Sequence, residues 1–269
     1  MSEDRTLRRV ILLGRKQGAA EALKRLLARG ITVTLVVAEQ SVRPRDNLFS
    51  VAKANHIPVC SADGDEVYRR IAARSPETAN IDLVISYLFH RRIRLPLITL
   101  PRRGCINFHP APLPDYKGRA GYNTAILDGR SEYGVSAHVI DSEAFDSGPI
   151  IKVNRFPIDT HSETAFSLEQ KAQPELLALF DEVLSLFESG KPVITIPNNG
   201  GLYMTKPQLE ALKQIDLTRD RGEDIDRKIR AFFFPPYTGA TIKLPEGEFT
   251  LVNQKVLEYI ARRFTDGTL

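Results

Sequence analysis

Cysteine is scarce in this sequence, with Cys60 and Cys105 the two examples among 269 residues. Two cysteines cannot build the disulfide framework of a small secreted domain, and they are too few for a cysteine-based metal cluster. We therefore expect no bound metal ion and a reducing, cytoplasmic location. Cys105 is interpreted as a small buried hydrophobic residue.

Long apolar runs are also absent. The longest, such as Ile31–Ala38, has the length of a strand, whereas a bilayer-spanning helix needs about 20 apolar residues. The charged start Met1–Arg9 lacks the apolar stretch of a cleaved signal peptide, so we expect neither a leader nor a membrane partner. Hydrophobic residues make up 42% of the chain, which is enough for a large core and excludes a disordered or collagen-like protein.

The charge balance is mildly basic. The sequence has 37 lysines and arginines against 33 aspartates and glutamates, a formal net charge of +4 at pH 7. This excess permits an anionic partner without naming one. The basic residues form short groups such as Arg91-Arg92 and Arg262-Arg263, so we interpret them as solvated faces in preference to a nucleic-acid surface.

The first half of the chain alternates segments typical of strands and helices. The predicted strands are short apolar or β-branched runs at Val10–Gly14, Ile31–Ala38, His56–Cys60, Ile81–Ser86 and Gly104–Phe108. The predicted helices lie between them at Gln17–Arg29, Leu48–Asn55 and Asp65–Arg74. Strands separated by helices form βαβ units, so we expect an α/β fold with a mainly parallel sheet, and a ligand beyond the carboxyl ends of its strands.

The second half has a different pattern. Strand-like segments precede a long helix, for which Thr160 and Glu163 predict a capping-box start and Gly190 an end. The other predicted helices are Gly121–Leu127 and Asp224–Phe233, and the predicted strands are Tyr133–Ile140 and Pro149–Phe156. Asn198–Gly201 predicts a turn, and Ala240–Val252 predicts a β-hairpin. We therefore divide the chain into a main domain at residues 1–190 and a small C-terminal α+β extension with a β-hairpin at residues 191–269.

Three polar residues near the middle of the chain form a candidate catalytic set, namely Asn107, His109 and Asp146. Asn107 and His109 are two residues apart at the end of a predicted strand, so their side chains project to the same side. An amide that can donate to an oxyanion and an imidazole that can carry a proton therefore share one patch. Asp146 lies on a loop closed by Gly148, where its carboxylate can orient the imidazole and stabilise its charge.

This set contains no serine or cysteine nucleophile, which suggests direct acyl transfer to an amine rather than a covalent acyl-enzyme. Asn107 and protonated His109 would stabilise the oxyanion, and His109 or Asp146 would relay the proton of the amine. Each residue alone fits a structural turn or loop cap, whereas the three together favour a function. His138 is interpreted as a core or supporting histidine in preference to a catalytic one.

At these residues the sequence resembles the folate-dependent formyltransferase family. The resemblance extends over Val10–Glu188 and rests on Asn107-Phe108-His109-Pro110, Leu113-Pro114-Asp115-Tyr116-Lys117-Gly118 and Asp146-Ser147-Gly148-Pro149. It implies a Rossmann-like fold, catalytic roles for Asn107, His109 and Asp146, and N10-formyltetrahydrofolate as formyl donor. It also implies a pterin pocket built largely from backbone, at Ser86, Tyr87, Leu88, Phe89, His90, Arg91, Ile140, Asp141, Ser142, Glu143 and Phe145.

The C-terminal segments are similar to those of the nucleotide-sugar formyltransferases within this family. The similar segments are Gly201–Met204, Ile215–Leu217, Lys228–Phe232 and Phe234–Ala240. They imply a GDP-, dTDP- or UDP-linked amino sugar as acceptor, for instance GDP-perosamine, of the kind used in O-antigen and lipopolysaccharide. Cations and aromatic rings are the candidate acceptor-binding residues, at Arg15, Lys16, Lys117, Arg119, Tyr122, Tyr203, Phe232, Phe234 and Tyr237.

Other interpretations stay open. A methionyl-tRNA formyltransferase with a shortened tail is one, although about seventy residues after the long helix are too few for the C-terminal barrel of those enzymes. A non-catalytic folate- or nucleotide-binding module that regulates a partner is another. The loop Gly14–Gly18 lacks the glycine-rich pattern of the glycinamide ribonucleotide enzymes. Phe232–Phe234 fits core packing as well as ligand contact, and the C-terminal hairpin with Gln254–Arg263 is a candidate contact of a homodimer.

Overall fold

The computed structural model describes residues 7–39 and 47–265, which form two compact units. The first unit contains the chain up to Pro114 together with Gly134–Asn154 and Gln173–Gly200. The second contains Asp115–Tyr133, Arg155–Ala172 and the chain from Gly201 onward. Each unit is therefore assembled from separate stretches of sequence. The boundary at residue 190 remains a prediction about where the catalytic part of the chain ends.

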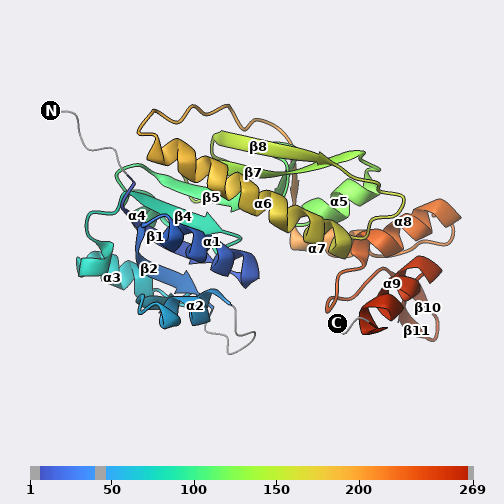
Figure 1. The fold of residues 1–269 in the computed structure, drawn as a ribbon. Coiled ribbons are helices and arrows are strands. Elements are labelled where there is room, and N and C mark those ends of the chain that lie inside the picture. Colours follow the sequence, from blue (N-terminus) through green and yellow to red (C-terminus); the bar gives the residue numbers. More distant parts are fainter. Residues whose placement is uncertain (1–6, 40–46, 266–269) are drawn as a thin grey trace. The chain divides into compact units, whose positions relative to one another are not determined.

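The first unit is built on a seven-stranded sheet with the order β3-β2-β1-β4-β5-β7-β8 (Figure 1). Its strands are β1 (Arg9–Gly14), β2 (Thr32–Ala38), β3 (Val59–Ser61), β4 (Leu83–Tyr87), β5 (Cys105–His109), β7 (Glu132–Ile140) and β8 (Ile150–Pro157). The strands from β3 to β5 in this order pair in parallel, and β7 pairs with β5 antiparallel. The predicted α/β fold with a mainly parallel sheet is confirmed.

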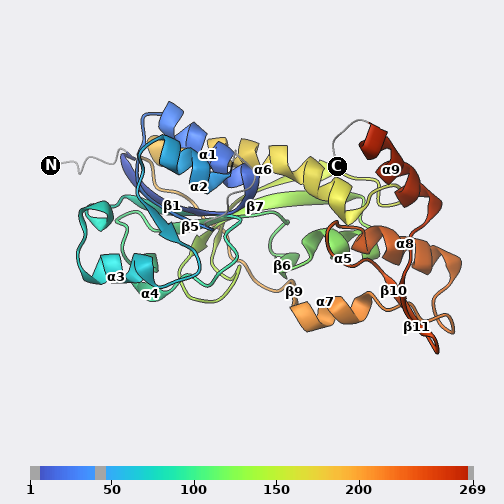
Figure 2. The same ribbon diagram turned by 90° about the horizontal axis from the view of Figure 1, so that it is seen from below.

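Helices cover both faces of this sheet (Figure 2). They are α1 (Lys16–Ala28), α2 (Leu48–Ala54), α3 (Glu66–Ala72), the short 3-10 helix η1 (Pro76–Thr78), α4 (Leu95–Ile98) and α6 (Ala165–Glu188), which continues from the second unit. Helices α1 and α2 lie on one side of the sheet, and α3 and α4 lie on the other. Among the described residues, no helix has the length and apolar character needed to cross a membrane.

The face beneath α3 and α4 changes from apolar to polar along its strands. On β4, Val84 is buried in the core of this face, and Ser86 follows it two residues later. On β5, Cys105 belongs to the same core, and Asn107 follows in the same way. Polar side chains therefore gather toward the carboxyl ends of the parallel strands, where the sequence predicts the ligand.

The opposite face contains a cluster of three aromatic rings. Tyr87 and Phe108, on neighbouring strands, have ring centroids 5.8 Å apart, and Phe180 of α6 lies 4.9 Å from Phe108 and 5.7 Å from Tyr87. Arg25 of α1 forms an ion pair with Asp181 of α6, so these two helices cover the same side of the sheet. The buried rings contribute to stability through their large apolar area and their edge-to-face contacts.

The second unit has its own set of short elements. They are β6 (Tyr116–Gly118), α5 (Gly121–Leu127), β9 (Leu202–Met204), α7 (Lys206–Leu212), α8 (Gly222–Phe232), β10 (Thr241–Leu244), β11 (Gly247–Thr250) and α9 (Gln254–Thr265). The predicted hairpin is confirmed, because β10 and β11 pair antiparallel and Leu244 pairs with Gly247 at the turn. Helices α5 and α8 are joined by Asn123, whose Nδ2 donates to the carbonyl of Ala231 at 2.7 Å.

The predicted capping box at Thr160 and Glu163 is wrong. Helix α6 begins at Ala165, and the reciprocal bonds at its start join Thr164 and Ser167. Ser167 N donates to Thr164 Oγ1 at 3.0 Å, and Thr164 N donates to Ser167 Oγ at 2.9 Å. Glu163 is 3% exposed and forms an ion pair with Lys171. The same three-residue spacing occurs twice here, and the pair next to the first helical residue forms the cap.

Asp82 joins the start of β4 to the start of β1. Its Oδ2 accepts hydrogen bonds from Arg8 N and Arg9 N, each at 2.9 Å, and its Oδ1 forms an ion pair with Arg102. The residue is 2% exposed. Burial alone would raise the pKa of Asp82, but the bonds from Arg9, Arg102 and Arg8 outweigh burial and lower the pKa below its ordinary value of 3.8.

We expect Asp82→Asn to lower the free energy of unfolding by about 2 kcal/mol, because charge-assisted hydrogen bonds to a buried carboxylate are lost. A group with a lowered folded pKa stabilises the fold above its unfolded pKa and loses this effect as the pH falls through the folded value. The difference between wild type and variant should therefore be constant above about pH 5 and shrink on acidification below the unfolded value. Urea unfolding at several pH values measures it.

The matched control is Asp63→Asn, which removes the partner of Arg91 in a pair whose side chains are 62% and 47% exposed. Screening by solvent makes such a pair weak, so this variant should unfold close to wild type. Equal destabilisation by the two variants would contradict the role given to Asp82.

Candidate active site

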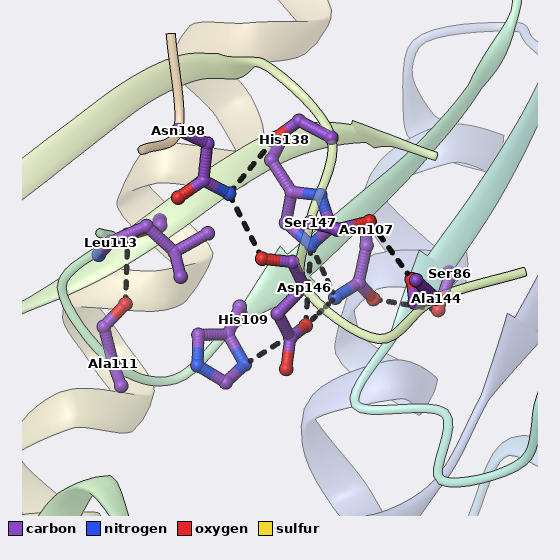
Figure 3. Close-up of polar contacts among 12 residues, drawn as sticks. Ser86, Asn107, His109, Ala111, Leu113, His138, Ala144, Asp146, Ser147 and Asn198 are labelled. Carbon is purple, nitrogen blue, oxygen red and sulfur yellow. Dashed lines mark hydrogen bonds and ion pairs between the residues drawn. The ribbon is translucent and has the colours of Figure 1, made fainter. Parts of the chain in front are cut away.

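The site begins with a row of three polar side chains across neighbouring strands. In the strand register, Ser86 of β4 lies opposite Asn107 of β5, and Asn107 lies opposite His138 of β7. Residues that are directly opposite in a sheet project from the same face, so the three side chains meet. Figure 3 shows this row with Asp146 beside it.

Hydrogen bonds fix the orientation of the Asn107 amide. Ser86 Oγ donates to Asn107 Oδ1 at 2.7 Å, and Asn107 Nδ2 lies 3.1 Å from His138 Nε2. His138 Nδ1 lies 2.8 Å from the carbonyl of Val139, which can only accept, so the proton of a neutral His138 ring sits on Nδ1. His138 Nε2 then accepts from Asn107, and the amide cannot flip without losing both bonds.

One carboxylate oxygen connects the catalytic candidates. Asp146 Oδ1 lies 3.4 Å from Asn107 Nδ2, 3.5 Å from His109 Nδ1 and 3.3 Å from His138 Nε2. His109, His138 and Asp146 are 7%, 2% and 8% exposed. The structure thus brings together the three residues that the sequence singled out, and it adds His138 as a buried supporting histidine, in line with the interpretation preferred for it.

The loop that carries Asp146 is tightly constrained. Asp146 has φ +49°, a left-handed conformation that aspartate tolerates better than most residues. At Gly148, a Cβ atom would lie 2.0 Å from the carbonyl oxygen of Val139, so only glycine fits. Val139 N also donates to the carbonyl of Pro149 at 2.8 Å. The loop is therefore pressed against β7, on which His138 also lies.

Ser136 holds the proline-rich segment after β5. Its Oγ donates to the carbonyl of Ala111 at 2.7 Å and accepts from Leu113 N at 2.8 Å. Ser136 is fully buried and pairs with His109 in the strand register. The exit from His109 is thus fixed by the side chain of Ser136.

Cys105 is 1% exposed, as the sequence predicted. Burial raises the pKa of the Cys105 thiol well above its ordinary value, so the group stays protonated and is a poor nucleophile. Among the described residues, no three His, Cys, Asp or Glu side chains are placed to hold a metal ion together.

The second segment predicted to bind folate, Ile140–Phe145, contacts residues that lie just after the first, Ser86–Arg91. Glu143 Oε1 accepts from the backbone N–H of Leu95 at 3.1 Å, and the Arg92 guanidinium lies 5.9 Å from the centroid of the Phe145 ring. Leu88, just after β4, has φ +56°, a conformation that is strained for leucine. Strained backbone is typical of ligand-binding segments, which fits a pocket built from main-chain groups.

The residues of these segments differ in what they offer a ligand. Tyr87 is fully buried in the aromatic core, so a contact from it would come from its backbone. Ser86 is bonded to Asn107, and Arg91 is paired with Asp63. The remaining residues are half-buried or exposed, namely Leu88, Phe89, His90, Ile140, Asp141, Ser142, Glu143 and Phe145.

Arg15, predicted to bind the acceptor, already has an acidic partner. Its Nε lies 3.5 Å from Glu39 Oε1, and His90 Nε2 lies 3.4 Å from the same oxygen. Burial, and then the charge of Arg15, lower the pKa of His90 despite Glu39. The cluster stands at the carboxyl ends of β1, β2 and β4, together with Lys16, the exposed first residue of α1.

The other acceptor-binding candidates belong to the second unit. Lys117 of β6 pairs with Tyr203 of β9, and Arg119 N donates to the carbonyl of Met204. Tyr203 is 48% exposed, Tyr237 is 62% exposed, and Arg119 is also exposed. These side chains are accessible on their own unit.

The aromatic candidates of this unit divide into two groups. Phe232 is 2% exposed, so the structure favours the core interpretation for it over contact with a ligand. The Phe234 ring packs on Phe166 of α6, at 5.8 Å between centroids, and lies 5.9 Å from Tyr237. Tyr122 is half-buried beside the ring of Tyr133, at 5.5 Å.

A cavity of about 960 Å³ in the first unit does not coincide with this site. Its lining includes Arg8, Asp82, Ile106 and Val139, and it does not include the three catalytic candidates. Ile106 and Val139 pair in the register next to Asn107 and His138, so they project from the opposite face of the sheet.

Two contacts of the site do not follow from any pattern in the sequence. Ser86 was predicted only as a folate contact, yet it orients Asn107 through a partner 21 residues away in the chain. Asn198 was predicted as part of a turn, yet its side chain reaches the loop of Asp146 (Figure 3). No local pattern marks either contact, because both depend on strands and loops that meet only in the fold.

The chain is similar in sequence to known proteins. A sequence model described as formyl transferase matches residues 7–184. GDP-perosamine N-formyltransferase of Brucella melitensis is 28% identical over 240 residues, which cover 88% of this chain and 89% of that protein. Methionyl-tRNA formyltransferase of Delftia acidovorans is 32% identical over 240 residues, which cover 83% of this chain and 72% of that protein.

A solved structure shares the fold. The N-formyltransferase of Helicobacter canadensis, in complex with folinic acid and dTDP-3-aminofucose, aligns with a TM-score of 0.69 and 21% identity. The alignment covers 88% of this chain and 84% of that one.

Proposed function

Because this chain belongs to the formyl transferase family, we propose that it transfers a formyl group from N10-formyltetrahydrofolate to the amine of a nucleotide-linked amino sugar. The observation that carries the proposal is the convergence of Asn107, His109 and His138 on Asp146 Oδ1, within 3.5 Å. A proton donor or acceptor, an amide donor and a fixed carboxylate are the groups that acyl transfer to an amine requires.

The bound folate would supply the formyl group. The amine of the acceptor would form a bond to the formyl carbon, the formyl oxygen would gain negative charge, and the bond from that carbon to the folate nitrogen would then break to release tetrahydrofolate. Asn107 would donate to that oxygen. Its Nδ2 contact with Asp146, at 3.4 Å, is longer than its contact with His138, at 3.1 Å, so an incoming oxygen replaces the longer contact at lower cost. Ser86 and His138 would meanwhile keep the amide in orientation.

His109 would accept and donate the proton that the attacking amine loses. Asp146 lies on its Nδ1 side at 3.5 Å, so Nε2 points away from the carboxylate. The neutral ring would take the proton of the attacking amine. The ring, then protonated, would stabilise negative charge on the formyl oxygen and pass its proton to the folate nitrogen as that nitrogen leaves. Asp146 would set the orientation and the charge of this ring.

The folate would occupy the surface formed by Ser86–Arg91 and Ile140–Phe145. The fit rests on the contacts of Glu143 and Phe145 with Leu95 and Arg92, which lie just after the first segment, and on the strained backbone of Leu88. Half-buried backbone groups there would hold the pterin, and exposed cations such as Arg91 and Arg92 would meet its anionic tail.

A nucleotide-linked amino sugar is proposed as acceptor on the relatives and on the chemistry of the accessible side chains. The GDP-perosamine relative is matched over 89% of its length and the methionyl-tRNA relative over 72%. Lys117, Arg119, Tyr203 and Tyr237 offer the few cations and rings that a sugar nucleotide needs. We further propose that the product serves O-antigen or lipopolysaccharide synthesis in the cytoplasm, a reducing compartment that suits two free, buried cysteines.

We expect His109→Asn and Asn107→Ala each to lower the rate of formyl transfer by about 100-fold, because each removes a group that stabilises charge in the transition state. The assay follows the mass of a 4-amino-sugar nucleotide after incubation with N10-formyltetrahydrofolate. Matched controls are His161→Asn and Asn199→Ala, whose side chains are exposed. Near-normal turnover in the first two variants, with folding intact, would refute these roles.

A thermal-shift screen with GDP, dTDP and UDP should single out one nucleotide, because a ligand that binds the folded state raises its stability by mass action. Raising the salt from 50 to 200 mM should then weaken its binding mildly, since few phosphates are neutralised. A transfer RNA would lose about 1000-fold or more over the same range through counterion release. A steep salt dependence with tRNA as the active acceptor would favour the methionyl-tRNA alternative.

A homodimer through the C-terminal hairpin is part of the proposal. Ile242, Leu244 and Phe249 share one face of the hairpin, and Leu244 and Phe249 are 44% and 47% exposed. Covering this apolar face with a second copy would remove it from water. We expect Phe249→Asp to sediment as a monomer, and Glu246→Ala, at the turn, to sediment as wild type. A wild-type chain that is monomeric at micromolar concentration would exclude the dimer.

A further inference from the structure

Asn198 lies outside the stretch that matches the family, in the segment after α6, and it reaches the loop of Asp146. Its Nδ2 donates to the carbonyl oxygens of Asp146 and Gly148, each at 2.9 Å. Because both partners are carbonyl oxygens, which only accept, the amide nitrogen must occupy this position. Asn198 is 8% exposed, so water competes poorly for these bonds.

The segment that carries Asn198 is itself anchored. Ile196, two residues earlier, forms an antiparallel bridge with Ile150 at the start of β8, in which each N–H donates to the other carbonyl at 2.9 Å. The sheet therefore fixes the backbone beside Asn198. The side-chain amide of Asn198 therefore holds in place the two carbonyl groups on either side of Ser147.

The loop needs such an external contact. Asp146 has a left-handed backbone at φ +49°, and Gly148 is pressed against Val139, so the loop conformation is costly by itself. Asp146 Oδ1 lies 3.4 Å from Asn107 Nδ2 and 3.5 Å from His109 Nδ1, at or near the upper limit for hydrogen bonds. Its approach to His138 Nε2, at 3.3 Å, is a close contact with a nitrogen that accepts from Asn107. A loop shift of a few tenths of an ångström therefore decides whether the carboxylate still meets its three partners.

We propose that Asn198 is a positioning residue, which holds the Asp146 carboxylate between His109, His138 and Asn107. The inference rests on the proposed function for its effect on turnover. Its structural part, the placement of Asp146 relative to the two histidines, does not depend on the substrate. Asn198 thus extends the active site beyond the residues 7–184 that match the family.

Two variants of the full-length chain remove the donors in different ways. Asn198→Ala leaves both carbonyls without this partner, and Asn198→Asp keeps the size but sets a carboxylate against two carbonyl oxygens. We expect kcat to fall by about tenfold or more in both, with little change in KM for the folate, because misplaced groups cost transition-state stabilisation. Asn198→Gln, which keeps the amide, should recover part of kcat. The control Asn199→Ala changes the exposed neighbour.

A double-mutant cycle separates positioning from a general loss of structure. If Asn198 acts through Asp146, then Asn198→Ala should have little further effect on kcat in an Asp146→Asn background. A merely structural contact would instead lower kcat by the same factor in both backgrounds. Equal factors would overturn the proposal, as would wild-type kcat in both Asn198→Ala and Asn198→Asp.

A readout without substrate keeps the two proposals distinguishable. The imidazole resonances of His109 and His138, assigned with His109→Asn and His138→Gln, should move in Asn198→Ala and stay in place in Asn199→Ala. If wild type transfers no formyl group but these resonances move, the proposed function fails and the positioning role stands. If wild type is active and the resonances do not move, the positioning role fails alone.

Discussion

The site depends on the register of three strands. Pairing β4, β5 and β7 so that Ser86, Asn107 and His138 lie opposite one another places a hydroxyl, an amide and an imidazole in one row. A slip of one residue in any of these strands would turn its side chain to the other face of the sheet, into the aromatic core under α6. The hydrophobic pattern that fixes the register therefore also fixes the chemistry, because Val84 and Cys105 in the core determine where Ser86 and Asn107 point.

Asp146 then completes the row from a loop rather than from a strand. One carboxylate oxygen meets three nitrogen atoms at 3.3 to 3.5 Å, and no single contact among them is short. The carboxylate therefore lies beside both histidine rings and the Asn107 amide without a short bond to any one of them. Neighbouring residues hold this arrangement in place. Gly148 packs against Val139, Asn198 donates to two carbonyl oxygens of the Asp146 loop, and Ser136 is hydrogen-bonded to the segment after His109.

The features of the fold and of the site that depend on neighbouring residues in the sequence could be predicted. Asn107 and His109 are two residues apart on one strand, so their shared side follows from strand geometry, and the parallel sheet follows from the alternation of elements. Contacts set by distant segments were not predictable in this way. The partners of Ser86 and Asn198, the pairing of β6 with β9, and the ion pair of Arg15 with Glu39 join residues that meet only after folding. At the start of α6, two pairs of residues have the same three-residue spacing, and the pair next to the first helical residue, Thr164 and Ser167, forms the cap.

The interleaving of the two units has a consequence for the order in which the chain can fold during synthesis. A chain leaves the ribosome from its N-terminus, and domains generally fold as units when their sequence is complete. The first unit needs Gln173–Gly200, which follows parts of the second unit in the chain. The strands that carry Asn107 and His138 are therefore made well before the segment that carries Asn198. The first unit can therefore complete its fold, and the loop of Asp146 can acquire its last fixed contact, only when synthesis has passed Gly200.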